Sequence, residues 1–412
     1  MEHNYNVALV FGASGISGWA MTKNLLSYPT ANTFRRIIAL TNRPRSLAEN
    51  GLPQDRRLEL YSGIDLRGSL EEVIERMKGK IPGLSEVTHM YYCASSNATS
   101  FTETILNARE INIAMTHNAV HATDRLCSDL KFVVHQTGTN YYGVAVFEHL
   151  DKFQINPPLK EDNPRVPAPY GDEVFYYAQV DLIREAAKGK QWGWCEVRPD
   201  MIVGFVPTET AMNLLEPVAL YLSLYRFIHG PGATVPFPGS PKSFIYTHTD
   251  TSQDILTKAE IYLSVVKPTE ANGEAFNIAD TATPGPWSVK WPMLAECFGL
   301  MGTAPIVDGW GGIDQWWNEH HEDYQRMCET YGLQRRAVSE SAWVFSKVSL
   351  TMLNRNRELS LDKIRSIGFT EELPVGQGHY VTLDRMVDER ILPPKSRFWQ
   401  IVMGNRYAID WL

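Results

Sequence analysis

Residues 7–18 read VALVFGASGISG, and this stretch decides the fold. Its first five residues form a continuous apolar run, which is typical of a strand covered on both faces. Three glycines follow with GxxGxxG spacing, and a helix-like stretch runs from residue 15 to about residue 26. Such a turn needs residues without Cβ, because a pyrophosphate requires close backbone approach and a helix N-terminus. The stretch predicts a dinucleotide site whose first contacts are Gly12, Ser14, Gly15, Ile16 and Gly18.

Short β-like runs alternate with longer helical patterns through the first two-thirds of the chain. We predict strands at residues 36–40, 58–61, 87–92, 131–135 and 195–197, a late strand at 276–280, and helices at 101–122 and 176–188. This alternation is typical of a parallel α/β sheet. The GxxGxxG spacing is the version typical of short-chain dehydrogenases and reductases. The expected fold class is therefore a Rossmann-type doubly wound parallel sheet of the extended short-chain dehydrogenase/reductase kind, with a smaller, mainly helical substrate-binding lid.

The composition changes after about residue 204. Proline and aromatic residues crowd residues 207–241 and 284–317, while residues 243–280 return to a strand–helix–strand pattern. We therefore expect a dinucleotide-binding core at 1–205, a first lid segment at 206–242, a return to the core at 243–283 and a C-terminal lid region at 284–412. The lid aromatics have two interpretations, ordinary packing or the apolar wall of a substrate pocket; they are Trp310, Trp316, Trp317 and Tyr324.

Charge and composition exclude several classes of function. Basic minus acidic residues is 39 − 47 = −8 without basic runs, which argues against nucleic acid or an anionic membrane as the main partner. The five scattered cysteines contain no CxxC, so we expect reduced thiols. The apolar stretch 214–228 is interrupted by two charges and a proline, and the chain begins without a signal-peptide pattern. We expect a cytoplasmic protein without membrane insertion. Adjacent His320 and His321 lack HxxxH spacing, so no metal is expected.

The end of the second predicted strand bears on the choice of cofactor. Enzymes that prefer NAD place an acid there for the ribose 2′-hydroxyl, whereas this chain has Asn42, Arg43 and Arg45. Two guanidinium groups suit a 2′-phosphate, so we expect NADPH/NADP; the alternative is that both arginines are solvated loop charges. Asp65, just past the third strand, is expected to accept from the adenine amine or to cap the next helix.

Hydride transfer to a carbonyl or an enone also needs a hydrogen-bond donor for the substrate oxygen. In this fold the usual donor is a tyrosine with a lysine four residues later. Tyr176 is followed at that distance by Val180 and Tyr177 by Asp181, so no YxxxK motif is present here.

Several segments together carry a family resemblance. They are residues 136–148, the Phe-Tyr-Tyr at 175–177, Arg-Pro-Asp-Met-Ile-Val-Gly-Phe at 198–205, Met-Asn-Leu at 212–214, and residues 274–277, 291–299 and 343–368. In this order they resemble the progesterone 5β-reductase/iridoid synthase-like group of atypical short-chain reductases, including its fungal branch. The resemblance covers nearly the whole chain.

The resemblance implies that Tyr176 hydrogen-bonds the substrate carbonyl while NADPH delivers hydride to the β-carbon of an enone. Asn140 occupies the position of the family's lysine, and its amide can contact a ribose hydroxyl or the substrate but supplies no positive charge. The acidic end of the tyrosine segment also differs, with Val180-Asp181. The expected cofactor contacts are completed by Leu66, Ala94, Gln136, Thr137, Tyr176 itself and Ile202.

The sequence thus predicts an NADPH-dependent reductase of an activated alkene or carbonyl in a bulky apolar metabolite, terpenoid- or polyketide-like, in secondary metabolism. Enone reduction is favoured over ketone reduction, because a neutral phenol can hydrogen-bond an enolate without giving up its proton. The loss of the lysine motivates an alternative, a non-redox cyclase or isomerase on a retained NADP-binding scaffold. A protein that only senses NADP(H) is a second alternative, which the retained Tyr176 argues against. A homodimer is left open.

Overall fold

The computed structural model describes residues 5–96, 104–307, 312–335 and 338–394. Its centre is a parallel sheet of seven strands in the order β10-β6-β5-β4-β1-β2-β3. The strands are β1 Asn6–Phe11, β2 Phe34–Thr41, β3 Leu58–Ser62, β4 His89–Tyr92, β5 Phe132–Gln136, β6 Gly193–Pro199 and β10 Glu274–Ile278. The predicted Rossmann-type doubly wound sheet is confirmed, with the strand order reversing between β1 and β4.

Helices cover both faces of the sheet, which explains the unbroken apolar run at its centre. Residues 7–10 of β1 are fully buried. Helices α1 Ile16–Asn24 and α7 Gln253–Ile261 pack on each other, and α3 Thr104–Leu126 packs between α2 Leu70–Lys80 and α4 Phe175–Ala186. Successive side chains of a strand point to opposite faces, and here both faces are covered by helices, so every position of the strand can be apolar.

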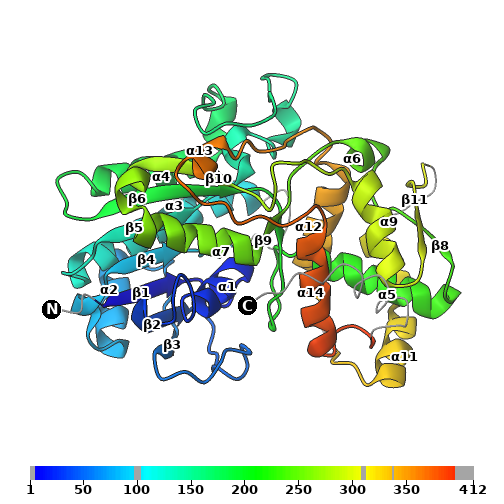
Figure 1. Cartoon of the computed structure of the whole chain (residues 1–412), viewed down its shortest axis with the longest axis horizontal. Helices are drawn as coiled ribbons and strands as arrows, with labels where there is room; N and C mark the ends of the chain where they lie inside the picture. The colour runs from blue at the N-terminus through cyan, green and yellow to red at the C-terminus, as the bar shows by residue number, and fades with distance from the viewer. Residues whose placement is uncertain (1–4, 97–103, 308–311, 336–337, 395–412) are drawn as a thin grey trace.

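The elements of the predicted lid segments stand beside the sheet, on the right in Figure 1, and we keep the name lid for this group. It contains α5 Leu215–His229, α6 Pro241–Ile245, α9 Trp287–Cys297, α10 Ile313–Glu319, α11 His321–Tyr331 and α12 Glu340–Thr351, and β8 Thr234–Pro236 pairs with β11 Met301–Thr303. The lid aromatics pack on one another: the Trp317 ring lies 4.6 Å from that of Tyr324 and 4.5 Å from that of Trp343. Trp316 lies 4.8 Å from Tyr221. Trp310 lies outside the described residues.

The C-terminal third returns to the core instead of staying in the lid. Leu359 forms a parallel β-bridge with Leu159, and α13 Asp362–Ser366 packs against β10 (Figure 1). Helix α14 Gln377–Asp388 then packs against the short strands β7 Ile202–Val203 and β9 Thr251–Ser252. The boundary expected at residue 284 remains a prediction, but the segment after it contributes to both parts of the molecule.

Two local features complete the core. Helix α7 continues into a π-helical turn, Tyr262–Val266, before α8 Pro268–Ala271. No helix in the described residues is long and apolar enough to cross a membrane. The predicted strands at 195–197 and 276–280 are observed with shifted ends, and the first three residues of the helix predicted at 101–122 lie outside the described residues.

Candidate functional site

The glycine-rich turn between β1 and α1 is built for close backbone approach. Gly12 has φ +85°, and a Cβ there would lie 2.8 Å from the Cys93 carbonyl oxygen and 2.9 Å from Ala94 Cα. A Cβ on Gly18 would overlap the Gly12 carbonyl. Gly15 is the N-cap of α1, without a side-chain cap, so the first N–H groups of the helix have no side-chain acceptor there. This turn fits a dinucleotide pyrophosphate, and Ser14 and Ile16 lie in it.

The loop after β2 is fixed by its backbone and leaves its side chains outward. The Thr41 hydroxyl donates to the Arg43 carbonyl at 2.9 Å, and the Gly63 N–H donates to the Asn42 carbonyl at 3.1 Å. The Asn42 and Arg43 side chains are exposed. The loop therefore holds Arg43 at the carboxyl edge of the sheet, where a 2′-phosphate would be neutralised.

Asp65 lies at the end of the β3 segment, but it does not cap the next helix. Its two carboxylate oxygens accept from Arg67 Nε at 2.9 Å and Nη2 at 2.8 Å, and these bonds lower the pKa of Asp65. The N-cap of α2 is Ser69, which forms a capping box with Glu72. The helix-cap interpretation of Asp65 is therefore wrong, and its contact with adenine stays a prediction. Leu66 beside it is buried.

The residues that end or follow β4 and β5 lie in the middle of the carboxyl edge of the sheet. Ala94 is half-buried beside Gly12, and the buried Gln136 Oε1 has no hydrogen-bond partner within the described part of the chain. Thr137 is directed toward β6: its N–H donates to the Val197 carbonyl at 2.8 Å and its hydroxyl to Glu196 Oε1 at 2.7 Å. Gln136 can therefore offer a side chain at this edge, whereas Thr137 bonds to its neighbouring strand.

Tyr176 lies in the first turn of α4 and reaches the same edge. A Cβ built on Gly138 would be 3.6 Å from the Tyr176 hydroxyl and 3.4 Å from the Pro199 carbonyl oxygen. The phenol is thus next to Gly138, in the segment that follows β5. Burial, and after it the Glu196 charge, raise the pKa of Tyr176 to about 12. Among the described residues, nothing hydrogen-bonds its hydroxyl, so the group is available as a donor.

Asn140, the residue in the lysine position, is engaged in its own loop. Its Oδ1 accepts from the Ala145 N–H at 3.0 Å, just after the 3₁₀ turn Thr139–Tyr142. This bond fixes the loop and leaves the Nδ2 hydrogens as its remaining donors. Ile202, the last expected cofactor contact, is half-buried in β7.

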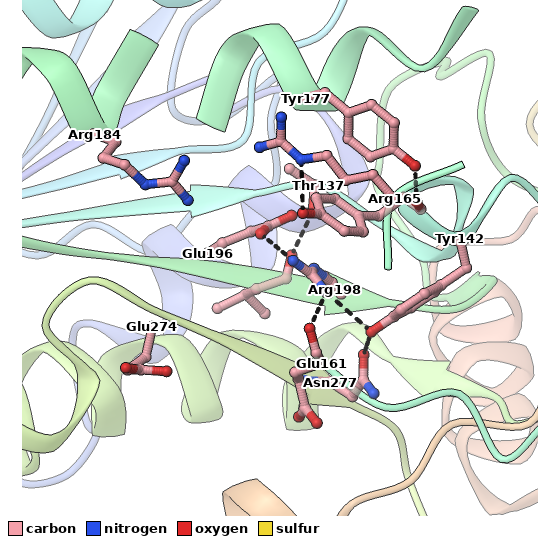
Figure 2. Close-up of polar contacts among 12 residues, drawn as sticks. Thr137, Tyr142, Glu161, Arg165, Tyr177, Arg184, Glu196, Arg198, Glu274 and Asn277 are labelled. Carbon is pink, nitrogen blue, oxygen red and sulfur yellow. Dashed lines mark hydrogen bonds and ion pairs between the residues drawn. The ribbon is translucent and has the colours of Figure 1, made fainter. Parts of the chain in front are cut away.

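A buried ion pair lies beneath this edge, as Figure 2 shows. Arg198 Nη2 lies 2.7 Å from Glu196 Oε2, and Arg198 Nη1 donates to the Tyr142 hydroxyl and to the Glu161 carbonyl, both at 3.2 Å. The Tyr142 hydroxyl in turn donates to Asn277 Oδ1 at 2.6 Å. The network joins β6 to β10 and to the loop after β5. We did not predict this network from the sequence as part of the site. The Arg-Pro-Asp segment at 198–200 was the feature of the sequence that could have indicated it.

A second buried group of charges lies between the core and the lid. Lys290 Nζ of α9 is 2.6 Å from His248 Nε2 and 2.7 Å from Asp250 Oδ1, and all three side chains are at least nine-tenths buried. In the residues that the structure describes, no group of three or more His, Cys, Asp or Glu side chains is arranged to hold a metal ion. His320 instead stacks on Trp316, with ring centroids 4.2 Å apart.

Comparisons with known proteins identify the family. A family model described as a PRISE-like Rossmann-fold domain matches residues 8–393. The chain is 52% identical to the short chain dehydrogenase ausT of Aspergillus calidoustus, covering 96% of each protein. It is 28% identical to the 3-oxo-Delta(4,5)-steroid 5-beta-reductase of Arabidopsis thaliana, covering 88% of this chain and 87% of that protein.

A solved structure shares the fold at lower identity. The UDP-glucose 4-epimerase of Thermus thermophilus, in complex with NAD, has a TM-score of 0.57 and 15% identity, covering 92% of this chain and 98% of that chain. With the family match over nearly the whole chain, the chain belongs to the PRISE-like Rossmann-fold family and is an oxidoreductase of the short-chain dehydrogenase/reductase superfamily.

Proposed function

We propose that this protein is an NADPH-dependent reductase of an enone in a bulky apolar metabolite, with Tyr176 as its hydrogen-bond donor. The observation that carries the proposal is the Tyr176 hydroxyl, which lies against Gly138, just after β5, at the carboxyl edge of the sheet. The activity for which the Arabidopsis relative is named, reduction of a 3-oxo-Δ4 steroid, and the fungal dehydrogenase relatives support this class of reaction. We extend it to a terpenoid- or polyketide-like substrate of secondary metabolism.

The cofactor contacts follow the strand ends from β1 outward. The Gly12–Gly18 turn would hold the pyrophosphate, Arg43 the 2′-phosphate, and Asp65 the adenine. Gln136 and Tyr176 would face the nicotinamide half, and Asn140 would contact the ribose through Nδ2. A bound nicotinamide dinucleotide supplies the hydride.

The part played by Tyr176 follows from its pKa. At physiological pH the phenol is neutral, because a pKa of about 12 keeps its proton bound. A neutral phenol donates a hydrogen bond to the substrate oxygen, and that bond strengthens as negative charge appears there. Reduction of a ketone requires full proton transfer to the alkoxide, and no lysine at position 140 lowers the phenol's pKa. Addition to the β-carbon of an enone is therefore the favoured reaction.

The first prediction tests Tyr176 directly. Replacing Tyr176→Phe should lower kcat about 10²-fold or more, since removal of one oxyanion donor usually costs that much. The assay follows NADPH absorbance and product mass with two probes, cyclohexenone and a 3-oxo-4-ene steroid. Tyr262→Phe is the control, because Tyr262 lies in the π-helical turn and its hydroxyl donates to the Ile367 carbonyl. Unchanged turnover in Tyr176→Phe, with NADPH affinity retained, would assign the donor to another residue.

Asn140 supports a second candidate, a cyclase or isomerase that retains the dinucleotide scaffold. Its side-chain oxygen is bonded to Ala145, and the position carries no ammonium group. The same assay separates the two: conversion of substrate to a product of the same mass, without NADPH consumption, would exclude the reductase and favour this candidate.

A further inference from the structure

The segment that faces Tyr176 is held by two similar sets of contacts. Gly138 lies between Thr137 and Thr139, whose hydroxyls donate to Glu196 at 2.7 Å and to Asp200 at 3.0 Å. Each acid belongs to β6 or directly follows it, and each is paired with a buried arginine. The first arginine, the partner of Glu196, is Arg198 of β6, which stands at the centre of Figure 2. The second is supplied by a remote part of the sequence.

That second arginine is Arg357. Its Nε lies 3.2 Å from both carboxylate oxygens of Asp200, and the two side chains are 5% and 2% exposed. The residues are 157 positions apart in the sequence. Arg357 stands in the segment that leaves α12 and returns to the core before α13. Thr139, Asp200 and Arg357 therefore join three distant parts of the chain next to Gly138.

The backbone around Arg357 is fixed on both sides, so its side chain approaches Asp200 from a defined position. The Arg357 N–H donates to the Thr247 carbonyl at 3.0 Å. Two residues on, Leu359 pairs with Leu159 in a parallel bridge. A long side chain on an ordered backbone gives up less freedom on forming an ion pair than a side chain on a free loop.

The charge of Arg357 matters because Asp200 is deeply buried. Burial raises the pKa of Asp200, while Arg357 and the Thr139 hydroxyl oppose that change. Without the arginine, Asp200 either takes up a proton or remains an uncompensated buried charge, and both weaken the position of the Gly138 segment. A displacement of about 1 Å at a reacting group can cost about 10²-fold in rate.

We propose that Arg357 is a positioning residue, which acts through Asp200 and Thr139 to hold Gly138 against the Tyr176 hydroxyl. The proposal rests on the reductase function proposed above. It makes the C-terminal segment part of the reaction centre, although that segment contributes no residue to the cofactor turn. The Asp200–Arg357 pair thereby couples the return from the lid to the placement of substrate against Tyr176.

The test compares Arg357→Met, Arg357→Lys and Arg357→Met combined with Asp200→Asn. The control is Lys363→Met in the following helix, α13, because Lys363 pairs with Glu274 at the amino-terminal end of β10, away from the carboxyl edge. Three readouts are taken: kcat with cyclohexenone, NADPH affinity by nicotinamide fluorescence, and amide hydrogen exchange of residues 137–143. The last readout does not depend on turnover.

Arg357→Met should lower kcat at least tenfold, leave NADPH affinity within about twofold and speed exchange of residues 137–143, while Lys363→Met changes none of these. Arg357→Lys should recover part of kcat, since it restores charge without the planar guanidinium. The double variant removes both charges, so it should fold even if Arg357→Met does not, and its kcat should stay low. Wild-type kcat in the double variant, or unchanged exchange in Arg357→Met, would overturn the proposal. A wild-type protein that does not reduce the probe would instead count against the reductase function, and the exchange measurement would still decide the positioning.

Discussion

Tyr176 and Asn140 differ in the hydrogen bonding of their side chains. The phenol reaches the carboxyl edge because the first turn of α4 faces Gly138, and its hydroxyl has no partner in the described structure. The amide of Asn140 is one residue from Thr139 but turns back to Ala145. A lysine at position 140 has no acceptor for the Ala145 N–H, so the substitution changes both the charge and the loop. In the proposed reaction, Tyr176 therefore donates a hydrogen bond and retains its proton.

Arg43 is the residue on which the proposed preference for NADPH rests. Its side chain is exposed on a loop whose backbone is hydrogen-bonded to Thr41 of β2 and Ser62 of β3, and no acid stands at the end of β2. Arg43→Ala should weaken NADPH binding at least about tenfold and leave NADH binding unchanged, because a charge-assisted bond to phosphate contributes about 1.5–3 kcal/mol. Fluorescence titration with both nucleotides measures the two affinities. Arg56→Ala, another exposed arginine, is the control. Equal affinities of the wild type for NADPH and NADH would refute the preference.

Among the elements, α7 carries a carboxyl group that its surroundings do not satisfy. Glu260 is completely buried, one residue before the end of α7, and neither carboxylate oxygen has a partner among the described residues. Burial raises its pKa to about 8. Ser264 lies in the π-helical turn that follows, and its hydroxyl donates to the backbone carbonyl of Glu260 at 2.9 Å. The backbone is satisfied here, but the side chain is not.

We therefore predict that Glu260 makes the free energy of unfolding decrease as pH rises. Its folded pKa lies above its unfolded value, so between about pH 4.5 and 8 the folded state binds the extra proton, and stability falls as pH rises. Glu260→Gln should remove this decline and raise the melting temperature more at pH 8.5 than at pH 5.5. Thermal unfolding at the two values measures it, with exposed Glu270→Gln as the control. The same pH dependence in Glu260→Gln as in the wild type would show that the group is already charged or solvated.

Local patterns predicted the elements better than they predicted the contacts between them. The strand β1 and its glycine turn were readable because a buried apolar run followed at once by three spaced glycines is rare outside a strand-to-helix turn that binds phosphate. The prediction that Asp65 caps the next helix was wrong because Ser69, three residues before Glu72, was the stronger cap signal in the sequence. The Asp200–Arg357 pair could not be predicted, since no local pattern records a partner 157 residues away. Burial of charge is a property of the assembled fold.

For the whole molecule, one feature of the junction between core and lid is a buried group of charges. The core provides His248 and Asp250 just before β9, and the lid provides Lys290 from α9. Trp287, one turn earlier on α9, lies 4.8 Å below the Lys290 ammonium group. A lid joined to its core only by apolar packing tolerates many relative positions, whereas a buried ion pair has one good geometry.

Lys290 should therefore contribute more to stability than any exposed lysine. Lys290→Met leaves Asp250 buried without its cation, and breaking such a pair from one side costs about 3–5 kcal/mol. Adding Asp250→Asn should return much of that free energy, because the uncompensated charge is then gone. Lys188→Met is the control, since its pair with Glu185 is about two-thirds exposed on both sides and should change the free energy of unfolding by less than about 0.5 kcal/mol. Urea unfolding of the four proteins measures these differences. If Lys290→Met were as stable as the wild type, Asp250 would have to be protonated or reached by water, and the junction would be held by its apolar contacts alone.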